Sequence, residues 1–133
     1  MATVTHAVED YLKVIWKLSH RGREGERVPV GDIAANLRVS APSVTGMVQK
    51  LQGMGLVHYT RYDGVRLSAK GRKIALEIVR HHRLWELYLH TRLGVPLDRV
   101  DVEAERLEHV LSDDMEELLS RARELRGWQG RMS

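Results

Sequence analysis

The sequence predicts a mainly α-helical protein with one small β-hairpin, divided into two domains. Apolar residues recur at helical spacing in several segments, and two short β-leaning runs flank a single turn sequence. Residues 1–73 contain twelve Lys and Arg against six Asp and Glu, whereas residues 74–133 contain nine against twelve. A chain of 133 residues with 43% hydrophobic content is long enough to bury a core. We therefore expect a basic domain over 1–73 and an acidic one over 74–133.

Three helices are predicted in the basic half. In "THAVEDYLKVIWKLSH", Thr5 is a candidate N-cap, and the glycine-containing loop "RGREGE" follows the helix. "VPVGDIAANLRV" predicts a second, shorter helix. The third helix, residues 41–54, has Ser40 as its N-cap, Pro42 in its first turn and Gly55 at its end. The apolar positions that give the first helix its period are Val8, Leu12, Ile15 and Leu18.

A β-hairpin is predicted directly after the third helix. The runs 56–61 and 65–67 flank a Tyr-Asp-Gly turn at 62–64, which is typical of a hairpin. Helix, short helix, turn, helix and hairpin form the element order of a winged helix-turn-helix. In that fold, 41–54 would be the recognition helix and 56–67 the wing.

The acidic half is predicted to be helical throughout. Ser68 is a candidate N-cap for a long helix that runs to about Arg92. The stretch "LGVPLD" breaks the helical pattern, because glycine and proline both interrupt helices. Two further helices are predicted over about 99–111 and 113–126.

The predicted recognition helix and wing carry residues suited to binding double-stranded DNA. Between Ile33 and Lys73 there are seven basic residues and one acidic residue, Asp63. Small hydroxyl side chains approach phosphates and base edges closely, and basic side chains bind backbone phosphates. A winged helix used only for protein contacts, with solvated basic residues, is the alternative. The candidate DNA contacts are Thr5, Ser40, Pro42, Ser43, Thr45, Gln49, Lys50, Arg61 and Arg66, with Lys70, Arg72 and Lys73 as further phosphate contacts.

Carboxylates and histidines gather in the acidic half. On one predicted helix, Glu105, Glu108 and His109 would share a face, and His82 and Glu86 stand at i and i+4 on another. The chain has no cysteine, and carboxylates with imidazole suit Mn²⁺ or Fe²⁺, while zinc also stays open. From spacing alone, solvated surface pairs neutralised by neighbouring arginines remain the alternative. The candidate metal ligands are Asp10, His82, Glu86, Asp101, Glu105, Glu108 and His109.

Five stretches of the sequence resemble the diphtheria toxin repressor family of metal-dependent regulators. They are "VEDYLKVIWKL", "SAPSVTGMVQKL", "GLVHYTRYDGVRLSAKGR", "HHRLWELYL" and "EAERLEHVLSD", in the family's order and spacing over roughly residues 5–126. The chain is similar to the short manganese transport regulators, which lack the SH3-like third domain of longer members. The resemblance implies a homodimer with an N-terminal winged helix and a helical domain that dimerises and binds metal. It further implies repression of metal-uptake genes through an operator in double-stranded DNA.

The resemblance also implies two metal sites. It assigns Asp10, Glu105, Glu108 and His109 to a main, corepressor site, and His82, Glu86 and Asp101 to an ancillary site or its border. Iron-sensing members carry methionine and cysteine at the positions of Asp10 and Glu105, so the carboxylates here favour Mn²⁺, with Fe²⁺ as the alternative. Lys13 stands where the manganese regulators carry a second glutamate, so we expect one ion in the main site. At Gly46 the family usually offers a longer polar side chain toward DNA.

Two other classes of function remain as alternatives. One is a winged-helix regulator that responds to a small organic ligand, and the other is a small metal-dependent enzyme. The chain contains no HExxH motif and no glycine-rich phosphate loop, so we expect neither catalysis nor a small organic substrate. The start "MATVTHAVEDYLK" lacks the apolar core of a signal peptide, and no apolar run of about 18 residues occurs. We therefore expect a cytoplasmic protein without a membrane partner.

Overall fold

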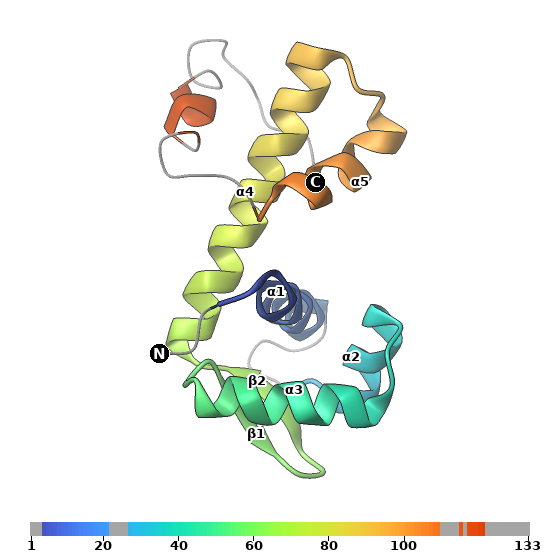
Figure 1. Cartoon of the computed structure of the whole chain (residues 1–133), viewed down its shortest axis with the longest axis vertical. Helices are drawn as coiled ribbons and strands as arrows, with labels where there is room; N and C mark the ends of the chain where they lie inside the picture. Colours follow the sequence, from blue (N-terminus) through green and yellow to red (C-terminus); the bar gives the residue numbers. More distant parts are fainter. Residues whose placement is uncertain (1–3, 22–26, 110–114, 116, 122–133) are drawn as a thin grey trace. The chain divides into compact units, whose positions relative to one another are not determined.

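The computed structural model describes residues 4–21, 27–109, 115 and 117–121 (Figure 1). The chain divides into two compact units, Met1–Leu76 and Glu77–Ser133. The described part is mainly helical with one two-stranded sheet, which confirms the predicted fold class. None of the helices in these ranges is long and apolar enough to cross a membrane.

The first unit begins with three helices, and the predicted N-caps of the first and the third are confirmed. The helices are α1 (His6–Arg21), α2 (Val30–Leu37) and α3 (Ala41–Gly53). Thr5 Oγ1 accepts a hydrogen bond from the Val8 amide at 3.3 Å, and Ser40 Oγ accepts one from the Ser43 amide at 3.2 Å. Each cap satisfies an amide at a helix start that has no partner inside the helix. Gly55, with φ of 76°, follows the end of α3 in the left-handed region, as its position predicted.

The predicted hairpin forms β1 (Val57–Thr60) and β2 (Gly64–Leu67), which pair antiparallel. Val28 adds a bridge to this hairpin, with its amide 2.7 Å from the Val65 carbonyl and its carbonyl 2.8 Å from the Val65 amide. Gly64 lies against the same segment with φ of 102°, and a Cβ there would stand 2.6 Å from the Val28 carbonyl oxygen. Only glycine allows this approach, so the base of the wing is tied to the chain before α2.

One hydrophobic core joins the three helices and the hairpin of the first unit. The face of α3 that carries Val44, Val48 and Leu51 is buried in this core. Gln49 and Lys50 lie on its exposed side, so the packing of α3 presents its polar residues to solvent. The side chains of this core with 0% exposure are Val8, Leu12, Ile15, Ile33, Val44, Val48, Leu51, Val65 and Ala75.

The helix α4 (Ala69–Leu93) starts within the first unit, and its residues from Glu77 onward belong to the second unit together with α5 (Leu97–Leu107). Ser68 Oγ accepts a hydrogen bond from the Gly71 amide at 3.1 Å, which confirms the predicted cap of α4. The predicted break after α4 is also present, because Gly94 has a φ of 70° and Pro96 precedes α5. Small apolar clusters hold the unit together, one of Leu84 and Leu119 and another of Leu89, Val100 and Ala104.

The end of α5 differs from the prediction. The helix ends at Leu107 rather than near residue 111, so Glu108 and His109 lie in the turn that follows. Glu108 nevertheless keeps the helical backbone conformation, with φ of −60° and ψ of −25°. The Glu108 amide still bonds to the Ala104 carbonyl at 2.9 Å, and the side chain is fully buried against His82 of α4. The contact with His82 on α4 therefore fixes the side chain of Glu108, and helical periodicity did not predict this contact.

Of the helix expected over 113–126, residues 115 and 117–121 are helical and the rest lies outside the described residues.

Candidate metal centre and nucleic-acid interface

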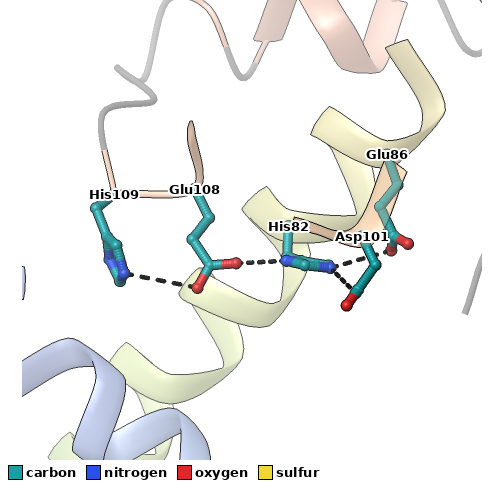
Figure 2. A network of polar contacts seen from close by, with 5 residues as sticks. All are labelled: His82, Glu86, Asp101, Glu108 and His109. Carbon is teal, nitrogen blue, oxygen red and sulfur yellow. Dashed lines mark hydrogen bonds and ion pairs between the residues drawn. The ribbon is translucent and has the colours of Figure 1, made fainter. Parts of the chain in front are cut away.

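His82 is the centre of a polar network in the second unit (Figure 2). Its Nδ1 lies 2.5 Å from Glu108 Oε2, and its Nε2 lies 2.8 Å from Asp101 Oδ1. Nε2 also lies 3.4 Å from Glu86 Oε1, one helical turn along α4. One buried imidazole therefore links α4, α5 and the turn after α5.

The contacts of His82 shift its pKa in opposite directions. Ionised carboxylate oxygens only accept hydrogen bonds, so a carboxylate at each ring nitrogen favours the protonated form of His82. Burial lowers the pKa of His82, but the hydrogen bond and charge of Glu108, the charge of Glu86 and the hydrogen bond to Asp101 outweigh it. The pKa of His82 is therefore raised above its ordinary value.

The same residues form a donor set that fits a divalent metal ion. One ligand atom each of His82, Glu86 and Asp101 lie within 4.8 Å of one another. A nitrogen that gives up its proton and two carboxylate oxygens form an oxygen-rich set without sulfur, which suits Mn²⁺ or Fe²⁺. Glu86 is buried, whereas the side chain of Asp101 is 67% exposed. The set is therefore open to solvent on the side of Asp101.

Two of the residues predicted for the main site meet in the turn after α5. His109 Nε2 lies 3.6 Å from Glu108 Oε1, the oxygen of that carboxylate that His82 does not contact. Glu105 is exposed on the last part of α5, and Asp10 is half-buried on α1 in the first unit. The family resemblance assigned His82 and Glu108 to different sites, whereas the structure joins them by a direct contact. A contact across 26 positions leaves no local pattern in the sequence, so spacing could not predict it.

The predicted DNA contacts all belong to the first unit and lie at its surface. Ser40 and Ser43 hydrogen-bond to each other through their hydroxyls at 2.8 Å, at the exposed start of α3. A Cβ on Gly46 would meet no atom within 4 Å, so the middle of the exposed face of α3 has open space. Thr45 is half-buried, and the other predicted contacts are exposed, namely Thr5, Pro42, Gln49, Lys50, Arg61, Arg66, Lys70, Arg72 and Lys73.

Two family models match most of the chain. Residues 3–65 match the iron dependent repressor N-terminal DNA binding domain, and residues 68–123 match the iron dependent repressor metal binding and dimerisation domain. The first match covers the predicted winged helix, and the second covers the predicted helical domain. They confirm the resemblance that the five sequence stretches indicated.

Individual relatives agree with the family models. The diphtheria toxin repressor of Corynebacterium glutamicum is 34% identical over 120 residues, covering 90% of this chain and 51% of that protein. The HTH-type transcriptional regulator MntR of Lysinibacillus sphaericus is 38% identical over 109 residues, covering 81% of this chain and 75% of that protein. The solved structure of the manganese regulator SloR matches with a TM-score of 0.71 and 38% identity, covering 90% of this chain and 53% of that chain. The chain thus spans about half the length of the first and third of these proteins and three quarters of MntR.

Proposed function

We propose that this chain, which belongs to the iron-dependent repressor family, is a metal-activated DNA-binding repressor of metal-uptake genes, acting in the cytoplasm. Its proposed partners are an operator in double-stranded DNA and a second copy of itself. We assign DNA binding to residues 1–73, and metal binding and dimerisation to residues 74–133. The observation that carries the proposal is the imidazole of His82 held among three carboxylates, a donor set that fits a divalent metal ion.

The metal that fits the proposed ligands is Mn²⁺, with Fe²⁺ as the alternative. His82, Glu86 and Asp101 would hold an ancillary ion, because one nitrogen and two oxygens converge there. Asp10, Glu105, Glu108 and His109 would hold the main ion, a set that rests on the family resemblance. When bound, the metal supplies positive charge that neutralises these carboxylates. Lys13, a buried cation on α1, supports one ion in the main site rather than two.

The link between metal and DNA would come from ligands carried by different units. Asp10 belongs to the first unit, whereas the other proposed main-site ligands belong to the second. An ion held by both would restrain the DNA-binding unit relative to the dimerisation unit. A dimer reads two half-sites only when its recognition helices stand about 34 Å apart, so this restraint favours operator binding. By linkage, metal and DNA then strengthen each other's binding by about 1–3 kcal/mol.

The exposed apolar residues of the second unit support the proposed dimer. Leu93, Leu97 and Val102 are large apolar side chains that solvent reaches at the end of α4 and along α5. Apolar surface marks protein interfaces where such residues form a contiguous patch. The matched family model describes this region as a dimerisation domain. We therefore propose that a second copy covers these residues.

Metal-dependent DNA binding tests the proposal. Duplexes selected from a random-sequence pool by the Mn²⁺-loaded protein would be used in gel shifts with chelator or with added Mn²⁺. We expect Mn²⁺ to raise the affinity about 5- to 150-fold, the range of typical allosteric coupling. Equal affinity with chelator and with Mn²⁺ would contradict the proposal. Calorimetric titration with Mn²⁺, Fe²⁺ and Zn²⁺ separates the alternatives, because a regulator of a small organic ligand would bind none of them.

A further inference from the structure

Gly46 occupies the centre of the exposed face of α3. The residues three and four positions before and after it share this face, because an α-helix makes one turn in 3.6 residues. They are Pro42, Ser43, Gln49 and Lys50, and all four are exposed. Gly46 is exposed too, and a Cβ at this position would meet no atom within 4 Å. Four side chains therefore surround a position that has none.

The fold of the first unit does not require glycine at position 46. Gly64 has a positive φ, and a Cβ on Gly71 would overlap the Leu56 carbonyl oxygen, so the chain needs glycine at both of those positions. Neither reason applies to Gly46, whose φ is not positive and whose Cβ position is open. Glycine also loses more backbone entropy than alanine in a helix. A glycine that costs stability and that the fold does not need indicates close approach of a partner to the backbone of α3.

The surroundings of Gly46 favour double-stranded DNA as that partner. All four neighbours are proposed DNA contacts, α3 contains no acidic residue, and Lys50 adds a positive charge. The Ser43 hydroxyl accepts a hydrogen bond from the Ser40 hydroxyl at 2.8 Å, which holds one edge of the exposed face in place. A polar face with positive charge and without carboxylates suits a polyanion.

We propose that the open position at Gly46 receives the 5-methyl group of a thymine in the DNA half-site, so that Gly46 selects thymine at one position of the operator. The inference rests on the proposed function and deepens it, because it assigns one base of the operator to one residue of the chain.

The chemistry of the open position limits what can fill it. Gly46 has no side chain that donates or accepts a hydrogen bond, and its backbone groups lie in the middle of α3, where the helix uses them. A polar group placed there would lose its hydrogen bonds to water and gain none, whereas an apolar group loses nothing. The thymine methyl is the apolar group that the four bases present in the major groove.

Replacing thymine by uracil tests the inference, because uracil lacks the methyl group and keeps the base pair. Each thymine in one half-site of the duplex selected with Mn²⁺-loaded protein is replaced in turn. Fluorescence anisotropy then gives the affinities of wild type and Gly46→Ala. For wild type, we expect replacement of one particular thymine to weaken binding about fourfold, which corresponds to one buried methyl group. The alanine methyl of Gly46→Ala would occupy the same space. This variant should therefore bind the uracil duplex at least as tightly as the thymine duplex.

Gly53→Ala is the matched control. Gly53 lies two turns after Gly46 on the same side of α3, is exposed, and also has no atom within 4 Å of an added Cβ. Recognition helices contact base edges with their N-terminal residues, so Gly53→Ala at the end of the helix should keep the uracil effect of wild type. Urea denaturation of both variants shows that each is folded.

The outcomes separate the inference from the proposed function. A selected half-site without thymine, or a wild type that binds every uracil duplex as tightly as the thymine duplex, would overturn the inference alone. So would uracil effects in Gly46→Ala that equal those of wild type, or loss of the effect in Gly53→Ala. Failure of the Mn²⁺-loaded protein to select any sequence would instead overturn the proposed function, and the inference with it.

Discussion

At the scale of single residues, the imidazole of His82 has two roles: it compensates a buried carboxylate, and it is a proposed metal ligand. Both of its nitrogens lie within hydrogen-bond distance of carboxylates, so the protonated ring compensates the buried charge of Glu108. A buried carboxylate without such a partner costs several kcal/mol. The same nitrogen that faces Glu86 and Asp101 must lose its proton before it can bind a metal. The residue that stabilises the metal-free unit is therefore also the one whose proton competes with the metal.

The raised pKa of His82 predicts how the stability of the chelated protein depends on pH. A group whose pKa is higher in the folded state stabilises that state fully below its unfolded value, about 6.5 for histidine. This contribution is lost as pH rises through the raised, folded pKa. In urea denaturation with chelator, we expect the free energy of unfolding to include a contribution that falls as pH increases above about 6.5.

Two histidine variants separate the contribution of His82 to the free energy of unfolding from the contributions of other titratable groups. His82→Gln should lose the pH-dependent contribution, because an amide does not titrate. His58→Gln, which changes an exposed histidine of β1, should retain it. The same pH profile in wild type and His82→Gln would show that His82 is not the cation in this network.

At the scale of elements, two helical glycines have opposite surroundings. Gly46, in the middle of α3, has open space where a Cβ would stand. Gly71, in the first turn of α4, lies against the chain, and a Cβ there would be 2.0 Å from the Leu56 carbonyl oxygen. The sequence shows two glycines in helices and nothing that distinguishes them. The start of α4 packs on the segment before β1, and this packing requires glycine at position 71 but not at position 46.

Alanine at these two positions should therefore change stability in opposite directions. Gly46→Ala should raise the free energy of unfolding by about 0.5–1 kcal/mol, because alanine loses less backbone entropy in a helix. Gly71→Ala should lower it by about 1–3 kcal/mol, because the added methyl overlaps the backbone. Urea denaturation of both variants measures the two changes. A similar loss in both would show that α3 does not tolerate a side chain at Gly46.

At the scale of the whole molecule, proposed metal ligands lie in both units. Asp10 is carried by α1 in the first unit, and Glu108 follows α5 in the second. If the ion joins them, losing either ligand removes the coupling and leaves each unit folded. If these residues instead form structural ion pairs, losing either one damages the protein without any metal.

Asp10→Ala and Glu108→Gln distinguish these two roles. We expect both variants to bind DNA in the presence of Mn²⁺ no more tightly than wild type does with chelator, a loss of about 5- to 150-fold. Sedimentation should still show a folded dimer. Asp98→Ala, which changes an acidic residue of α5 that belongs to neither proposed metal site, should retain the response to Mn²⁺. Monomeric or unfolded Asp10→Ala and Glu108→Gln would assign these residues a structural role.

The sequence by itself determined the elements, the fold class and the family of this protein. Helix caps such as Ser40 and Ser68 and the Tyr-Asp-Gly turn are local signals, so their positions follow from neighbouring residues. The tertiary structure alone decided that α5 ends at Leu107 and that His82 bonds to Glu108. It also decided that Gly64 and Gly71 lie against the backbone of other segments. These features depend on contacts between segments far apart in the chain, and local periodicity carries no information about such contacts.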